Sequence, residues 1–191
     1  MQGLMTVGYF LVSLFFSLAL FVLWGRLIVR LFKLSALEPV SELIDKLTNP
    51  VVKPIEAILA SKHYLKRAYD LPCLILIIAV EFLKFIVLSY LLYGRLMPIG
   101  YLLLFVLSDF IVQPANFFFY LILIRVVMSY VQPHWQGPVA LVVKKLTEPL
   151  LILGRKIIPD ISGFDFSPFI IMLILKVVVL FMSASLPLRL A

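Results

Sequence analysis

Long apolar runs dominate this sequence and leave few folds open to it. They lie between residues 4–25, 71–93, 99–131 and 168–186. A helix of about 20 apolar residues crosses the ~30 Å hydrocarbon core of a bilayer. Mean hydropathy is +1.13 and only 14% of the residues are charged, which excludes a water-soluble domain. The runs do not alternate as transmembrane β-strands do, so the sequence predicts an all-α polytopic membrane protein.

The segments that join these runs are copies of one another. Residues of the first linker recur 99 positions later in the second: Pro39 and Pro138, Lys46-Leu47-Thr48 and Lys145-Leu146-Thr147, Pro50 and Pro149. Arg26 and Arg125 share this spacing, which shortens to 96 at Pro72 and Pro168. The chain is therefore a tandem duplication of a span, a linker and a second span. We expect the first unit over residues 1–97, a short connecting membrane segment over 98–114, and the second unit over 115–191.

Each linker begins with an amphipathic pattern. Apolar residues recur at i, i+3, i+4 and i+7 in both copies: Val40, Leu43, Ile44 and Leu47, and Val139, Val142, Val143 and Leu146. A short basic helix of this kind between membrane spans lies in the membrane interface. It presents its charges to anionic lipid headgroups or to a membrane partner. The residues predicted to make these contacts are Lys46, Lys53, Lys144, Lys145, Arg155, Lys156, Asp165, Ser167 and Pro168.

Proline and serine positions predict where the linkers break. Pro50 and Pro54 are expected to break the first linker, because proline does not continue a helix interior. Ser167 is expected to cap the last span through its hydroxyl, with Pro168 in the first turn.

Charge sets the expected topology. Both linkers carry several basic residues, so both are expected on the cytoplasmic side, with an even number of crossings between them. One straight helix over residues 99–131 would be about 50 Å long, too long for a single span. We therefore predict a short re-entrant or kinked piece over Ile99–Pro114 and a span over Ala115–Val131. That gives four spans with both termini outside the cytoplasm; five spans with inverted repeats is the competing topology.

The ionisable residues within the apolar runs are Glu81, Lys84, Asp109, Arg125 and Lys176. A charge at the bilayer centre costs roughly 2.5–3.5 kcal/mol on insertion scales, so such residues face protein or water. Glu81 and Lys84 share a helix face and can pair, and Glu81 or Asp109 is the expected partner of Lys176. Arg26 and Arg125 are expected to snorkel to the cytoplasmic interface. These charges indicate either a proton or ion pathway or, as we favour, a buried network that fixes helix packing.

Enzymatic and cofactor-binding motifs do not stand out. The sequence has no glycine-rich phosphate loop, nucleophile elbow or HExxH motif, so no enzyme is expected. His63 and His134 are far apart in sequence and Cys73 is the one cysteine, so neither a metal nor another cofactor is expected. The net charge of +7 is assigned to cytoplasmic segments rather than to nucleic acid, because no aromatic-basic RNA motif accompanies it.

A family resemblance is carried by Arg125-Val126-Val127-Met128-Ser129-Tyr130, Leu146-Thr147-Glu148-Pro149-Leu150, Arg155-Lys156-Ile157-Ile158-Pro159 and Gly163-Phe164-Asp165-Phe166-Ser167-Pro168. As a set these segments closely resemble the YggT repeat, and the two-copy layout resembles the bacterial members. The chain departs from the family pattern at Leu153, where proline is usual, and at Asp70-Leu71-Pro72, which keeps only part of the final motif.

The resemblance implies an integral protein of the bacterial cytoplasmic membrane, in a family without an agreed activity. Family relatives are associated with osmotic or ion stress tolerance, with haem-protein assembly in chloroplasts, and with cell division or nucleoid organisation. Our first hypothesis is a non-enzymatic scaffold or an assembly and stress-tolerance factor, which presents basic interfacial helices to anionic lipid or to a membrane partner. The alternative is a small ion or proton transporter or channel, which four spans would build as a homo-oligomer.

Overall fold

The computed structural model describes residues 2–33, 40–58, 70–132, 136–158 and 165–186. Across these ranges it has six helices and no strand: α1 (Gln2–Leu31), α2 (Val40–Ile58), α3 (Leu71–Tyr93), α4 (Ile99–Val131), α5 (Pro138–Ile157) and α6 (Ser167–Ala184). The predicted all-α class is confirmed. The basic run over 61–67, His63 and His134 lie outside the described residues.

Four of these helices are long and apolar enough to cross a membrane: α1, α3, α4 and α6. This confirms the prediction of a membrane protein with four spans. The spans expose large apolar side chains on their outer faces, among them Phe15, Leu107 and Phe181. Such faces are compatible with lipid chains and not with water.

Residues 99–131 form one helix, α4, which contains Pro114. The predicted separate piece over Ile99–Pro114 is the first half of this helix, so this part of the chain crosses once. Proline removes a single i→i−4 hydrogen bond, and neighbouring helices make that loss tolerable inside a membrane. Here α1, α3 and α6 all pack on α4. Its length of about 50 Å means that α4 tilts or projects beyond the hydrocarbon layer.

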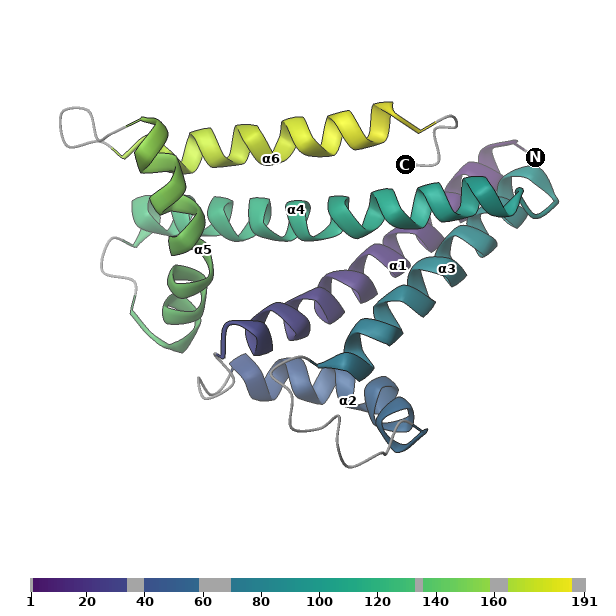
Figure 1. Cartoon of the computed structure of the whole chain (residues 1–191), viewed down its shortest axis with the longest axis horizontal. Helices are drawn as coiled ribbons and strands as arrows, with labels where there is room; N and C mark the ends of the chain where they lie inside the picture. The colour runs from purple at the N-terminus through teal and green to yellow at the C-terminus, as the bar shows by residue number, and fades with distance from the viewer. Residues whose placement is uncertain (1, 34–39, 59–69, 133–135, 159–164, 187–191) are drawn as a thin grey trace.

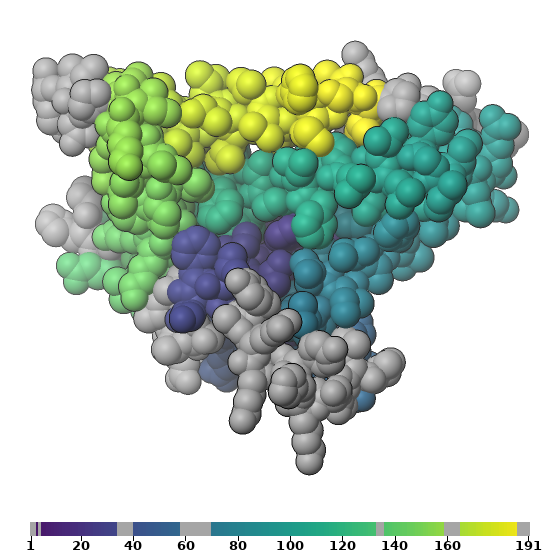
Figure 2. Space-filling model, in the orientation of Figure 1, coloured from purple at the N-terminus to yellow at the C-terminus, as the bar shows by residue number. Residues whose placement is uncertain are grey.

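Each repeat folds as a triangle of span, interfacial helix and span. In the first repeat α1, α2 and α3 pack on one another, and in the second α4, α5 and α6 do the same. Figure 1 shows α6 lying along α4, with α5 crossing the end of that pair. Figure 2 shows the same three helices as a continuous packed surface. Contacts of α4 with α1 and α3 join the two repeats.

Both interfacial helices lie at one end of the bundle. α2 follows the C-terminal end of α1, α5 follows the C-terminal end of α4, and α2 touches α5. The start of α1 and the end of α6 lie at the opposite end (Figure 1). The repeats are therefore parallel, as the even number of crossings predicted, and the inverted five-span arrangement is not found.

The largest apolar core lies where the interfacial helices meet the spans. It draws on five helices, through Leu20 of α1, Val52 of α2, Ile77 of α3, Phe117 of α4 and Leu146 of α5. The predicted apolar stripe of α5 is buried at Val142, Val143 and Leu146, whereas Val139 is exposed. The stripe of α2 is less complete, because Leu43 and Leu47 are exposed.

The linker prolines do not end their helices. Pro50 and Pro54 lie inside α2, and Pro149 lies inside α5, so the predicted break of the first linker is wrong. Each proline leaves a carbonyl oxygen without its N–H donor. At the membrane surface, water or lipid headgroups can bind that oxygen, so such prolines bend the helix without stopping it.

Candidate functional site

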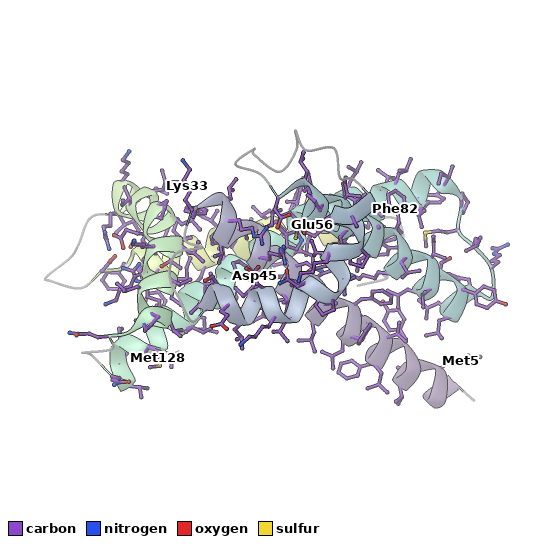
Figure 3. The ribbon with its side chains drawn as sticks, turned by 90° about the horizontal axis from the view of Figure 1, so that it is seen from below. Met5, Lys33, Asp45, Glu56, Phe82 and Met128 are labelled. Carbon is purple, nitrogen blue, oxygen red and sulfur yellow. The ribbon has the colours of Figure 1, made fainter. Side chains whose placement is uncertain are left out.

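Arg26, near the end of α1, is the centre of a polar cluster in the first repeat. Its guanidinium pairs with Asp70 at 2.8 Å, Asp45 at 3.4 Å and Glu56 at 3.5 Å. Figure 3 shows Asp45 and Glu56 along α2, whereas Asp70 directly precedes α3. Arg30 adds pairs to Asp70 at 2.7 Å and Asp45 at 3.1 Å. The Arg26 side chain is 1% exposed, so it does not snorkel: three carboxylates offset the cost of burying its charge.

Arg125, near the end of α4, starts the equivalent cluster in the second repeat. Its Nη2 pairs with Glu148 Oε2 at 2.8 Å, and Arg155 Nη1 pairs with the other Glu148 oxygen at 2.9 Å. Arg155 Nη2 also pairs with Asp165 at 2.9 Å. These ion pairs connect α4, α5 and the segment before α6. Arg125 is 21% exposed, so the central arginine is more accessible in this cluster than in the first.

A hydrogen-bonded chain from arginine to threonine to helix carbonyl occurs in both repeats. Arg26 donates to Thr48 Oγ1 at 2.7 Å, and Arg125 donates to Thr147 Oγ1 at 2.9 Å. Each threonine hydroxyl then donates to the carbonyl four residues earlier, at 2.7 Å in both cases. The hydroxyl therefore connects the span to the backbone of the interfacial helix. This is the geometry that the duplicated arginine and threonine encode.

The surroundings of this shared geometry carry opposite charge in the two repeats. At the 99-residue spacing, Asp45 is replaced by Lys144, Asn49 by Glu148 and Glu56 by Arg155. Helix α5 carries four basic residues and one acidic residue, a net charge of +3. Helix α2 carries two basic and three acidic residues, a net charge of −1. Only the second interfacial helix is therefore basic in itself.

Ion pairing shifts the pKa values of the second cluster. Burial alone would raise the pKa of Glu148, but hydrogen bonds and positive charge from Arg125 and Arg155 lower it below its ordinary value. Burial would also raise the pKa of Asp165, but hydrogen bonds from Ser167 and Arg155 lower it below its ordinary value. Hydrogen bonds to Glu148 and Asp165 raise the pKa of Arg155. Glu148, Asp165 and Arg155 are thus charged at neutral pH.

A cavity of about 310 Å³ lies beside the second cluster, between α4, α5 and α6. Its polar lining comes from Arg125, Ser129, Tyr130 and Asp165, and Pro168 lines it as well. The lining is mixed in charge, because the Arg125 guanidinium is paired with Glu148 and the Asp165 carboxylate lies in the same wall.

The basic residues predicted to bind lipid or a partner fall into two sets. Lys144, Lys145 and Lys156 are exposed on α5, and Arg155 is half-buried in the cluster. Lys46 and Lys53 are exposed on α2, but Lys46 pairs with Glu42 at 2.7 Å.

Ser167 does not act as the predicted helix cap. It begins α6 and no side-chain capping bond is formed there. Instead the Ser167 amide donates to Asp165 Oδ1 at 2.8 Å, so Asp165 satisfies the free N–H. Ser167 is buried because it packs against Gly154 of α5: a Cβ at Gly154 would lie 2.8 Å from Ser167 Cβ.

The intramembrane charges pair differently from the prediction. Lys84 of α3 forms an ion pair with Asp109 of α4, and Gln113 donates to Asp109 at 3.1 Å. Lys176 is paired with neither Glu81 nor Asp109; its ammonium lies 4.5 Å from the centre of the Phe119 ring, a cation–π contact.

Sequence reasoning missed the acidic partners of the two arginines. Asp45, Glu56 and Asp70 gave no signal of their own, since acidic residues are ordinary in a linker. The available signal was the repetition of Arg26 with Thr48 and of Arg125 with Thr147 at one spacing. No group of three or more His, Cys, Asp or Glu placed to hold a metal ion occurs in the described part of the chain.

Comparison with known proteins decides the family. The CCB3/YggT family model matches this chain twice, over residues 5–91 and 100–186. The chain belongs to the CCB3/YggT family. Both family copies contain the arginine, the threonine and the interfacial helix described above, so the two clusters are equivalent parts of one repeat. The second match includes residues 100–114, in agreement with a continuous α4.

Relatives of this CCB3/YggT protein match along most of their length. An uncharacterized protein of Pseudomonas aeruginosa is 28% identical over 93% of this chain and 89% of its own length. An uncharacterized protein of Vibrio alginolyticus is 31% identical over 83% of each chain. The uncharacterized protein YggT of Escherichia coli K12 is 29% identical over 88% of this chain and 85% of its own length. No solved structure matches the chain.

Proposed function

We propose that this CCB3/YggT protein is a non-enzymatic scaffold of the bacterial cytoplasmic membrane, which uses α5 to bind anionic lipid headgroups. The observation that carries the proposal is the charge of +3 on α5, set against −1 on α2. Lys144, Lys145 and Lys156 are exposed on this helix, and none of them forms an ion pair with an acidic residue in the described part of the chain. The same end of the bundle holds the cavity beside Arg125.

A lipid-bound α5 would give the protein a fixed surface for assembly with a membrane partner. The ion pairs of Arg125 and Arg155 hold α5 against α4 and α6, so the helix is a rigid platform rather than a loose basic segment. A role in stress tolerance or in the assembly of other membrane proteins, as the family resemblance implies, would use this platform. The family membership does not favour the alternative of an ion transporter.

Lipid retention tests the proposal. The full chain, purified in mild detergent, is mixed with phosphatidylglycerol or phosphatidylcholine, and bound lipid is counted by native mass spectrometry. Each basic residue near an anionic surface contributes about 1 kcal/mol. Replacing Lys144, Lys145 and Lys156 with Gln should therefore weaken phosphatidylglycerol binding by up to roughly 100-fold.

The matched control is Lys46→Gln with Lys53→Gln on α2, which should change retention little. Equal loss in the two variants, or equal binding of the two lipids, would contradict a docking role for α5. Survival of osmotic stress by cells carrying each variant then shows whether lipid docking serves stress tolerance.

A further inference from the structure

A polar cavity of about 220 Å³ lies inside the bundle, where all four spans contribute to its wall. Its uncharged polar lining consists of Ser13, Ser17, Ser108, Gln113, Asn116 and Ser183. The ion-paired Lys84 and Asp109 line it too. A polar cavity of this size has room for several water molecules. Ser183 and Leu186 place it toward the end of the bundle that is remote from the linkers.

Glu81 lies about one turn before Lys84 on α3 and is fully buried, 0% exposed. In the described structure no N–H or O–H group donates to either of its carboxyl oxygens. The charged groups that act on it are the Asp109 carboxyl of α4 and the Lys84 ammonium. Helices α1 and α2, which also pack on α3, bring no described charged group to it.

Two carboxylates and one ammonium leave one negative charge without a partner, in a region where an unpaired charge is costly. Two carboxyl groups can hydrogen-bond only if one of them carries a proton. A single proton removes the excess charge and supplies the missing donor.

We propose that Glu81 and Asp109 share one bound proton at neutral pH, with Lys84 as the fixed counter-charge, and so form a proton-binding site inside the membrane. A hydronium ion reaching the site through the cavity transfers its proton to one carboxylate oxygen and leaves as water. The ligand is the proton, and the site is independent of lipid docking at α5.

The site is not a repeated packing device. At the repeat spacings, Glu81 corresponds to Val177, Lys84 to Leu180 and Asp109 to Phe10. The second repeat thus packs α6 on α4 without these charges. The trio joins α3 of the first repeat to α4 of the second, so proton occupancy acts at the junction between the repeats.

Infrared spectroscopy of the full chain in lipid nanodiscs tests the proposal, because the C=O stretch of a protonated carboxyl group is separate from carboxylate and amide bands. At pH 7 we expect one protonated carboxyl group per chain in the wild type. Glu81→Gln and Asp109→Asn each leave one acid and one base, so both should abolish the band. Lys84→Met leaves two acids without a base and should double it.

Glu42→Gln, an exposed position on α2, is the matched control and should leave the band unchanged. Circular dichroism and gel filtration show which variants remain folded. Either isosteric variant, Glu81→Gln or Asp109→Asn, is sufficient by itself to test the site. No band in the wild type, or a band that persists in Glu81→Gln, overturns the proposal. A band that disappears when sodium replaces a large organic cation in the buffer overturns it in favour of a metal-cation site.

Discussion

At the scale of single residues, one arginine per repeat determines how the interfacial helix is held. Arg26 and Arg125 make the same bond to a threonine hydroxyl, yet their charged partners differ. Arg26 and Arg30 meet three carboxylates, of which Asp70 is buried, and almost nothing of Arg26 is exposed. Arg125 shares Glu148 with Arg155 at a more accessible position. The same residue type is therefore a structural centre in one repeat and part of an accessible surface in the other.

Replacing these arginines with methionine should have unequal effects. Arg26→Met leaves the buried Asp70 with Arg30 as its remaining partner, and removal of one partner from a buried ion pair costs up to about 3–5 kcal/mol. Arg125→Met should cost about 1 kcal/mol, since exposed pairs contribute less. Unfolding of both variants by sodium dodecyl sulfate in mixed micelles measures the difference. Equal destabilisation would show that burial of Arg26 does not govern its contribution.

At the scale of helices, packing overrides the local tendency of proline to end a helix. Pro50, Pro54, Pro114 and Pro149 all lie inside helices. Each such helix contacts at least two others, and this packing keeps the helix continuous across the proline. The close approach of α5 to α6 has a different local cause, the missing side chain of Gly154.

Gly154→Ala should therefore separate α5 from α6. The new Cβ would meet Ser167 Cβ at 2.8 Å and the Ser167 carbonyl oxygen at 3.0 Å, and backbone cannot move aside cheaply. Overpacking of this kind costs about 1–3 kcal/mol. Gly100→Ala in α4 is the control, because no atom lies within 4 Å of its added Cβ. The micelle unfolding assay compares the two; an unaltered midpoint for Gly154→Ala would refute the close contact.

At the scale of the whole molecule, the duplication produces two parallel units with their interfacial helices side by side. Contact between α2 and α5 requires both to lie on one side of the membrane. The short turn between α3 and α4, which includes the exposed Arg95, lies at the other end of these spans. The topology thus places one charged face, built from both linkers, opposite the end that carries the start of α1.

Single-cysteine labelling measures this sidedness. In a Cys73→Ala background, Lys46→Cys and Lys144→Cys should react with an impermeant maleimide only after cell lysis, because basic linkers stay in the cytoplasm. Arg95→Cys should react in intact cells. Cys73 itself is buried, so its removal leaves the labelled surfaces unchanged. Labelling of Lys46→Cys and Lys144→Cys from opposite sides would disprove the parallel arrangement.

The sequence by itself determined the membrane class, the four spans, the duplication and the shared side of the linkers. These properties depend on hydropathy, repeat spacing and charge along the chain, which are local in sequence. Only the tertiary structure decided that α4 is continuous, that Arg26 is buried, and that Lys84 pairs with Asp109 while Lys176 lies over Phe119. The physical reason is that a buried charge is stabilised by whichever groups the packed helices bring to it, and those groups come from segments far apart in the chain.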